Sequence, residues 1–200
     1  MFIVFEGIDG SGKTTIASIV ANELKSHGYK IFLTEEPTRT WLGEAVRRGI
    51  KEEKNPFTQA FLFFADRAEH IREIKKHLER GEIVICDRYI YSTYAYQGAQ
   101  LSPSMGLEKA LKWLETIYSP IRLDPDVVIL LTTSPLRGIG RIKNRERRES
   151  FERREFLERV QKIYVYLAEK YGFEIVDSDT SIEAVFEKVK EILRKFDIIP

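Results

Sequence analysis

The amino-acid sequence predicts an α/β fold in which helices cover both faces of a parallel sheet. Short apolar segments alternate with longer helical patterns along the 200 residues, which is typical of strand–helix–strand units. Five of the short segments are almost continuously apolar, as strands buried on both faces are. A glycine-rich turn joins the first of them to the first helical pattern, where such folds bind phosphate groups.

The five predicted strands fix the edge of the sheet at which ligands should bind. They are Phe2–Glu6, Lys30–Thr34, Glu82–Asp87, Asp126–Thr132 and Phe173–Asp177. Ligands of open parallel sheets bind beyond the carboxyl ends of the strands. Functional residues are therefore expected near residues 7–14, 35–40, 87–97 and 132–148.

The helical patterns lie between and after these strands. They span Lys13–His27, the segment from Asn55 to Gly81, Arg147–Tyr171 and Ser181–Phe196. Asn55 and Pro56 have the residue types of an N-cap and a first helical position, and Gly81 is expected to end that helix.

Length and composition indicate one folded domain over residues 1–200. The chain is 43% hydrophobic and 12% aromatic, with 12 glycines and 7 prolines, which excludes a disordered or collagen-like chain. A chain of this size buries roughly 70% of its unfolded surface, which is enough for a real core. No repeat or flexible linker divides the sequence.

Charge and the lengths of apolar runs exclude several classes of partner. The net charge of +1, from 32 basic and 31 acidic residues, argues against nucleic-acid binding through bulk charge. The longest apolar run, Phe57–Ala65, falls short of the roughly 20 residues of a membrane span. The chain opens on a strand-like segment, not on a secretion signal. We therefore expect a cytoplasmic protein that binds small molecules, with no nucleic-acid or membrane partner.

Cysteine and histidine give no sign of a metal centre. The one cysteine, Cys86, allows no internal disulfide and is expected in the core of a strand. His27, His70 and His77 have no metal-ligand spacing with one another and are expected on helix exteriors or ends.

The glycine-rich turn has the pattern of a phosphate-binding loop. Residues Gly7-Ile8-Asp9-Gly10-Ser11-Gly12-Lys13-Thr14 match G-x-x-x-x-G-K-[ST] between a predicted strand and a predicted helix. In such loops backbone N–H groups surround a polyphosphate, so Lys13 is expected at the β- and γ-phosphates and the Thr14 hydroxyl on Mg²⁺. An ordinary glycine-rich turn is the alternative. The dinucleotide pattern G-x-G-x-x-G is absent, which argues against a nicotinamide or flavin enzyme.

A second charged pair follows the third predicted strand. Asp87 is placed to hold the metal ion through water, and Arg88 offers a planar fork suited to an oxyanion. In isolation, an aspartate capping a turn beside a surface arginine would be the simpler interpretation. A phosphate-binding loop at the same edge of the sheet favours the functional one.

Four segments together resemble thymidylate kinases, in order and spacing, from residue 2 to about residue 170. The segments are Phe5-Glu6-Gly7-Ile8-Asp9-Gly10-Ser11-Gly12-Lys13-Thr14-Thr15, Thr34-Glu35-Glu36-Pro37-Thr38, Phe63-Phe64-Ala65-Asp66-Arg67-Ala68 and Asp87-Arg88-Tyr89-Ile90-Tyr91-Ser92-Thr93-Tyr94-Ala95-Tyr96-Gln97-Gly98. The last block is far more discriminating than the phosphate-binding loop. The resemblance implies a three-layer P-loop kinase fold with strand order 2-3-1-4-5, a homodimer, and Mg²⁺-dependent transfer of the ATP γ-phosphoryl group to dTMP.

The resemblance also implies roles for individual residues. Gly7, Ile8, Asp9, Gly10, Ser11, Gly12, Lys13, Thr14 and Thr15 would bind ATP, while Thr14 and Asp87 serve the metal ion. In the acceptor site Asp9 would approach the sugar 3′-hydroxyl, Phe63 stack on thymine, Arg67 donate to its O4 atom, and Arg88 hold the phosphate. Pro37, Thr93, Tyr96 and Gln97 would complete that site, with Arg39 or Arg47 as a further phosphate ligand.

The spacing of Phe63 and Arg67 independently favours base recognition. Residues four apart on a helix project from one face, so a flat ring and a forked donor would meet a pyrimidine together. An ordinary core helix explains the neighbouring phenylalanines, but it does not explain an arginine in line with Phe63.

A basic segment at about residues 134–150 is expected to act as a lid. The phosphate-binding loop contains no arginine, so the arginines that neutralise the transferred phosphoryl group must come from elsewhere. The candidates are Arg141, Arg145 and Arg148, with Arg137 or Arg141 flanking adenine. A solvated helix face is the usual alternative for such a run of charges. The segment departs from the usual family pattern, with Thr133-Ser134-Pro135 where Pro-Glu is common, which leaves the individual lid contacts open.

Two other functions remain open from the sequence. One is a kinase for a deoxynucleoside or for another nucleoside monophosphate; a nucleoside acceptor would leave Arg39, Arg47 and Arg88 without a phosphate to bind. The other is a nucleotide-binding regulatory switch, which would hydrolyse nucleotide slowly and use no small-molecule acceptor.

Overall fold

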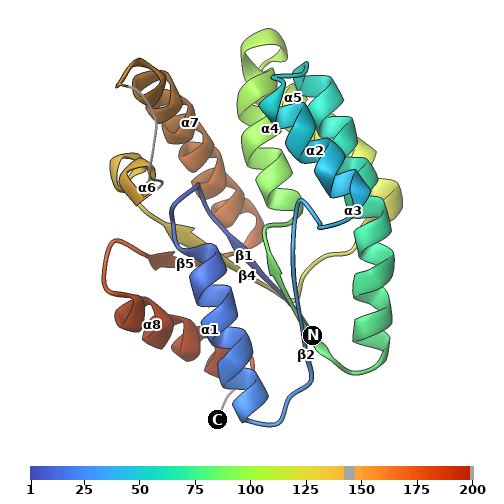
Figure 1. Ribbon diagram of the computed structural model, residues 1–200, viewed down its shortest axis with the longest axis vertical. Coiled ribbons are helices and arrows are strands. Elements are labelled where there is room, and N and C mark those ends of the chain that lie inside the picture. The colour runs from blue at the N-terminus through green and yellow to red at the C-terminus, as the bar shows by residue number, and fades with distance from the viewer. Residues whose placement is uncertain (142–146, 199–200) are drawn as a thin grey trace.

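The computed structural model describes residues 1–141 and 147–198 and contains the predicted parallel sheet (Figure 1). Its strands are β1 (Phe2–Glu6), β2 (Ile31–Glu35), β3 (Ile83–Asp87), β4 (Val127–Thr132) and β5 (Glu174–Asp177). All neighbouring strands pair in parallel, in the order β2-β3-β1-β4-β5. The predicted P-loop kinase α/β fold is confirmed.

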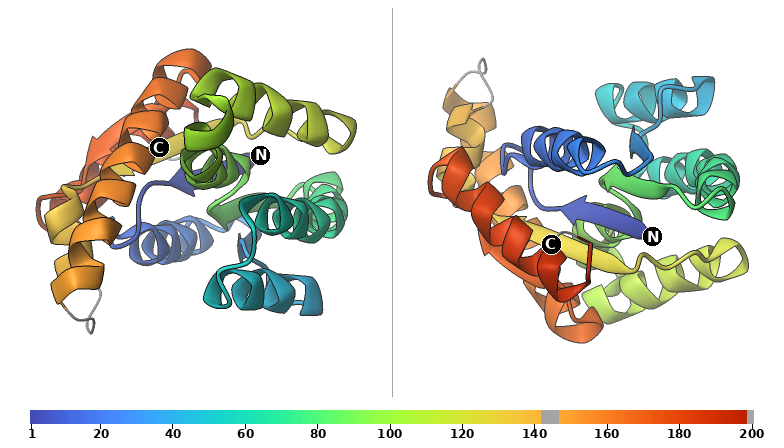
Figure 2. Two further views of the ribbon diagram at one scale, coloured as in Figure 1. Left: turned by 90° about the horizontal axis from the view of Figure 1, so that it is seen from above. Right: turned by 90° about the horizontal axis from the view of Figure 1, so that it is seen from below.

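Helices cover both faces of this sheet. They are α1 (Lys13–Ser26), α2 (Trp41–Lys51), α3 (Pro56–Glu79), α4 (Ile90–Met105), α5 (Leu107–Tyr118), α6 (Pro135–Arg141), α7 (Arg147–Tyr171) and α8 (Ile182–Lys195), with a 3₁₀ turn at Ser119–Ile121. One core cluster joins the sheet to α1 and α8, and the other joins it to α3, α4, α5 and α7. The view from above shows α1 and α4 on opposite sides of the central strands (Figure 2).

Alternating side chains of β1 supply both cores. Phe2 and Val4 belong to the cluster with α3, α4, α5 and α7, whereas Ile3 and Phe5 belong to the cluster with α1 and α8. This is the period of two that a strand imposes, here with apolar residues on both faces.

The edge strands depart from the prediction of burial on both faces. Leu33 in β2 is 40% exposed and Ile175 in β5 is 51% exposed. Both strands have a neighbour on one side only, which leaves part of each strand open to solvent. The apolar sequence of an edge strand therefore does not by itself show that both of its faces are covered.

The boundary signals of the long helix α3 are confirmed. The Asn55 side chain accepts a hydrogen bond from the Phe57 N–H at 2.9 Å, Pro56 is the first helical residue, and Gly81 with φ of 73° follows the helix end. Among the described residues, no helix combines the length and the apolar character needed to cross a membrane.

Candidate functional site

The phosphate-binding loop runs from the end of β1 to the start of α1. Gly7, Gly10 and Gly12 have positive φ angles of 143°, 80° and 90°. A Cβ atom at Gly7 would overlap the Leu131 carbonyl oxygen, and one at Gly10 would overlap the backbone of Gly138 in α6. Glycine is therefore required at Gly7 and Gly10 both by conformation and by space. Because α1 begins directly after the loop, the positive end of its dipole favours an anion here.

Lys13 is buried at the base of this loop. Its Nζ atom donates hydrogen bonds to the Ile8 carbonyl at 2.8 Å and to Ser11 Oγ at 3.3 Å. Burial and the nearby Arg88 guanidinium lower the pKa of Lys13 to about 7, although neighbouring carboxylates, Asp87 among them, act in the opposite direction. The ammonium group is thus held where a phosphate would supply its missing counter-charge.

Thr14 and Asp87 form a pair suited to a magnesium ion. The Thr14 hydroxyl donates a hydrogen bond to Asp87 Oδ2. Asp87 Oδ1 is buried and has no hydrogen-bond partner among the described residues. A hydroxyl and a carboxylate are oxygen ligands that Mg²⁺ accepts alongside water and phosphate oxygens. In the part of the chain that the structure describes, no cluster of three histidine, cysteine or acidic residues could hold a metal ion.

Arg88 is held beside Asp9 by a set of directed contacts. Its Nη2 atom lies 2.6 Å from Asp9 Oδ1, while Nη1 donates to the Gly7 carbonyl at 3.0 Å and to Ser92 Oγ at 3.2 Å. The Arg88 guanidinium carbon lies 5.2 Å from the centre of the Tyr96 ring. Arg88 adopts a left-handed backbone with φ of 69°, a conformation that costs free energy in a residue other than glycine.

The buried carboxylate of Glu6 supports the position of Arg88. No sequence pattern identifies this role. Its Oε1 atom accepts from the backbone N–H groups of Tyr89 and Ser92, at 2.9 and 3.1 Å. Its Oε2 atom accepts from the hydroxyls of Ser92 and Tyr164, at 2.6 and 2.9 Å. Burial raises the pKa of Glu6 despite these hydrogen bonds. Glu6 therefore ties the start of α4, directly after Arg88, to β1 and α7.

A cavity of about 390 Å³ joins most of the predicted acceptor-site residues. Asp9, Pro37, Phe63, Arg67, Arg88, Tyr96 and Gln97 all line it. They come from the loop after β1, the loop after β2, α3, the loop after β3 and α4. Tyr96 also accepts a hydrogen bond from the Asp9 N–H at 3.1 Å. Segments far apart in the sequence thus meet at the carboxyl edge of the sheet, as the parallel topology predicts.

Three predicted residues lie outside the lining of this cavity. The exposed Arg39 pairs with Glu35 at 2.8 Å and faces a second cavity, of about 580 Å³, that Thr14 and Asp87 also line. The two terminal nitrogens of Arg47 donate to the carbonyls of Thr38 and Pro37, at 2.8 and 2.7 Å, so in this structure Arg47 braces the loop after β2. Thr93 is buried in α4.

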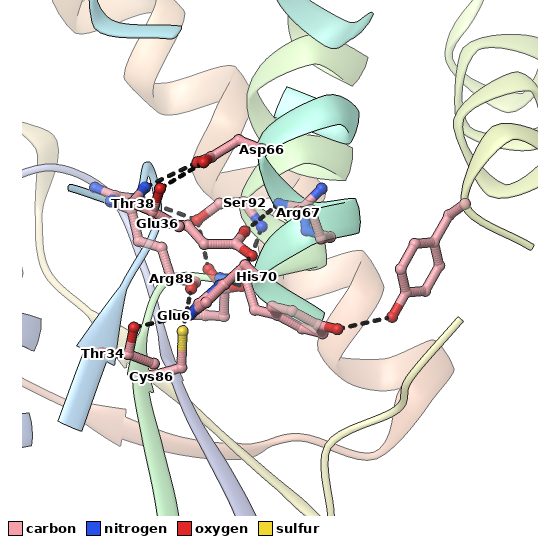
Figure 3. Close-up of polar contacts among 12 residues, drawn as sticks. Glu6, Thr34, Glu36, Thr38, Asp66, Arg67, His70, Cys86, Arg88 and Ser92 are labelled. Atoms are coloured by element: carbon pink, nitrogen blue, oxygen red, sulfur yellow. Dashed lines mark hydrogen bonds and ion pairs between the residues drawn. The ribbon is translucent and has the colours of Figure 1, made fainter. Parts of the chain in front are cut away.

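Arg67 is almost fully buried and shares a carboxylate with a histidine (Figure 3). Its Nη2 atom lies 2.5 Å from Glu36 Oε2, and His70 Nδ1 lies 2.9 Å from Glu36 Oε1. The expectation that His70 lies on a helix exterior is wrong, because the loop after β2 packs over that face of α3. No sequence signal linked Glu36 to His70, since 34 residues separate them.

A small pocket of about 210 Å³ lies on the other side of the phosphate-binding loop. Ser11, Gly12, Thr15, Ile16, Ser178, Thr180, Ile182 and Val185 line it, so the loop between β5 and α8 contributes residues that the sequence did not reveal. Arg137, expected beside adenine, donates to the Asp179 carbonyl in the same loop at 2.8 Å.

The predicted lid is described only in part. Arg141 is the last residue of α6 and Arg148 lies in the first turn of α7. Arg145 lies outside the described residues.

Comparison with known proteins agrees with this geometry. The family model described as thymidylate kinase matches residues 5–189. A protein of Methanosarcina barkeri named "Probable thymidylate kinase" is 40% identical, over 96% of this chain and 95% of its own length. Proteins with the same name from Staphylothermus marinus and Methanocaldococcus jannaschii are each 38% identical, over 96% and 100% of this chain and 94% and 97% of their own lengths. A match of this extent, from the first strand to α8, shows that the chain belongs to the thymidylate kinase family of enzymes.

Proposed function

We propose that this enzyme transfers the γ-phosphoryl group of ATP to dTMP, giving dTDP and ADP, and so serves dTTP synthesis in the cytoplasm. One observation carries the proposal: Phe63, Arg67 and Arg88 line a single cavity beside the phosphate-binding loop. A ring and a donor for a base, together with a second guanidinium for a phosphate, match a pyrimidine nucleoside monophosphate.

In this proposal, catalysis is positioning and charge neutralisation with no covalent intermediate. The loop and Lys13 hold the β- and γ-phosphates of ATP, while Arg88 exchanges part of its contact with Asp9 for the acceptor phosphate. Asp9 then orients the deoxyribose. Thr14 and Asp87 would hold Mg²⁺, which supplies charge neutralisation across the β- and γ-phosphate oxygens when bound.

The donor base is proposed to lie in the pocket next to the phosphate-binding loop. Ser178, Thr180 and Ile182 line this pocket together with Ser11 and Gly12. Arg137 donates to the Asp179 carbonyl in the same loop, which supports Arg137, with Arg141 as the alternative, as the residue that flanks adenine. These contacts support ATP as the phosphoryl donor.

The direct test is ADP release measured with ATP across a panel of nucleoside monophosphates and deoxynucleosides. Rapid turnover with dTMP, and dTDP as product, supports the proposal. Preference for thymidine would indicate a nucleoside kinase, and slow hydrolysis without an acceptor product would indicate a regulatory switch.

Arg88→Ala should weaken dTMP binding by about 2–5 kcal/mol, because a charge-assisted contact to the acceptor phosphate is lost. ATP binding should not weaken, since Arg88 lowers the pKa of Lys13 and its removal leaves Lys13 more fully protonated. Equilibrium titration with each nucleotide measures both effects. Arg88→Lys keeps the charge without the fork and should recover only part of the dTMP affinity. If the variant instead loses affinity for ATP and not for dTMP, Arg88 binds the donor nucleotide, and its assignment to the acceptor phosphate is wrong.

Replacing Arg141, Arg145 and Arg148 together by alanine should lower kcat by about 10²–10³-fold while the affinity for dTMP changes little, because lid arginines engage mainly in the transition state. The matched control replaces Arg72, Lys75 and Lys76, which are exposed basic residues of α3. An unchanged kcat in the lid variant would show that these arginines do not act in catalysis and would favour the interpretation of a solvated helix face.

The homodimer remains a proposal. Phe57 and Phe61 of α3 are exposed, and their ring centres lie 5.2 and 5.6 Å from that of the partly buried Trp113 in α5. Burial of these two phenylalanine rings against a second copy would account for their exposure. Sedimentation of the wild type and of Phe61→Lys tests this proposal.

A further inference from the structure

A chain of buried hydrogen bonds runs from β2 to Arg67 (Figure 3). Thr34 Oγ1 lies 2.8 Å from His70 Nε2, His70 Nδ1 lies 2.9 Å from Glu36 Oε1, and Glu36 Oε2 lies 2.5 Å from Arg67 Nη2. The side chains of Arg67, Glu36 and His70 are 1%, 3% and 0% exposed. We call these four residues the Arg67 relay.

The chemistry of Glu36 fixes the direction of its hydrogen bonds in this relay. Burial alone would raise the pKa of Glu36, but Arg67 and His70 outweigh it and leave that pKa below its usual value. An ionised carboxylate only accepts hydrogen bonds, so His70 Nδ1 carries a hydrogen and donates a hydrogen bond to Glu36. The other ring nitrogen, Nε2, lies 2.8 Å from the Thr34 hydroxyl. Contacts at both ring nitrogens therefore fix the orientation of the imidazole.

The relay occupies one end of the Arg67 fork and leaves the rest for a ligand. Arg67 Nε and Nη1 are buried and have no hydrogen-bond partner among the described residues. Arg67 lines the 390 Å³ cavity, while the rings of Phe64 and Tyr89 lie 5.9 and 5.4 Å from its guanidinium carbon. Buried N–H groups without partners are costly, so a ligand acceptor in this cavity would be strongly favoured.

We propose that His70 is a positioning residue for recognition of the pyrimidine base. It holds Glu36, and Glu36 holds Arg67 Nη2, so that the free N–H groups of Arg67 point toward a carbonyl acceptor on the base. This inference rests on the proposed function, because it needs a base in this cavity. His70 itself does not line the cavity, and its effect is transmitted through Glu36.

Two substitutions distinguish the contributions of the two ring nitrogens of His70. His70→Asn keeps an amide donor near the position of Nδ1, toward Glu36, whereas His70→Gln keeps one near Nε2, toward Thr34. Removing a hydrogen bond to a charged group should lower kcat/KM for dTMP and dUMP by about 10- to 100-fold in His70→Gln. His70→Asn should recover most of this loss. The change should appear in KM for the acceptor, with kcat and KM for ATP nearly unchanged.

Base selectivity distinguishes positioning from a general loss of structure. Cytosine has an amino donor at C4 where thymine and uracil have the O4 acceptor, so kcat/KM for dCMP should hardly change in His70→Gln. The dTMP/dCMP ratio of kcat/KM should therefore narrow about 10- to 100-fold. The matched control is Ile74→Val. Ile74 is fully buried one turn further along α3, so this variant should lower stability without altering the dTMP/dCMP ratio of kcat/KM. Thr34→Val removes the hydrogen bond between Thr34 and His70 but keeps the one between His70 and Glu36. It should therefore narrow the dTMP/dCMP ratio less than His70→Gln does.

The outcomes distinguish a failure of the role of His70 from a failure of the proposed function. A wild-type enzyme that prefers dTMP, together with an unchanged ratio in His70→Gln, overturns the role of His70 and leaves the proposed function standing. A wild-type enzyme that does not phosphorylate dTMP removes both. If His70→Gln does not fold, His70→Leu removes the same hydrogen bond to Glu36, and an unchanged dTMP/dCMP ratio of kcat/KM in His70→Leu overturns the inference.

Discussion

The enzyme is expected to use dCMP at least about 10⁴-fold less efficiently than dTMP, while dUMP falls by only about 10–200-fold. Thymine and uracil differ by one methyl group, which an apolar pocket converts into modest discrimination. Cytosine instead presents its N4 amino donor where thymine presents the O4 acceptor. In the cavity that amino group would meet the Arg67 guanidinium, whose Nε and Nη1 donors have no hydrogen-bond partner among the residues that the structure describes. Measurement of kcat/KM for the three monophosphates gives the order.

Removing Arg67 should compress the gap between dTMP and dCMP more than the gap between dTMP and dUMP. A single Arg67→Met change would leave the buried Glu36 carboxylate without its guanidinium partner, which costs about 3–5 kcal/mol of stability. The double variant Arg67→Met with Glu36→Gln removes both charges and is therefore the better test. Wild-type enzyme that phosphorylates dCMP as well as dUMP would show that Arg67 does not recognise O4.

The inner strands and the phosphate-binding loop were predictable because their signals are local. β1 is apolar from Phe2 to Phe5, and the glycine pattern after it matches a conformation that the structure shows at Gly7, Gly10 and Gly12. The assembly of Phe63, Arg67 and Arg88 followed from the family resemblance and from the helical spacing of the first two. Strand topology then brings these segments to one edge.

Helix α4 shows why other parts were not predicted. Ile90–Met105 is packed by α3, α5 and α7, so ten of its residues are buried and its sequence has no clear polar face. Its start carries no side-chain cap of its own and is held by Glu6, 86 residues before Ser92. Such long-range contacts leave no periodic signal in the sequence. The same reason hid the link between His70 and Glu36.

Lys13→Ala is expected to lower kcat by about 10²–10³-fold, because the developing charge on the phosphates loses a preorganised partner. Among the described residues, the buried side chain donates hydrogen bonds only to the Ile8 carbonyl and Ser11 Oγ, so its truncation removes few contacts of the folded enzyme. Single-turnover measurement with ATP and dTMP gives the rate, and thermal unfolding shows that the variant is folded. Turnover near the wild-type value would reject the assignment of Lys13 to the phosphates.

The pH dependence of ATP binding provides an independent test of the same residue. With a pKa of about 7, Lys13 is increasingly neutral in the free enzyme as the pH rises above that value. ATP binds best to the protonated amine, so binding must take up a proton, and Kd should increase toward tenfold per pH unit between about pH 7.5 and 9, where phosphate groups are already ionised. In Lys13→Arg the guanidinium stays protonated, and this slope should disappear. A wild-type slope that persists in Lys13→Arg would assign the titration to another group.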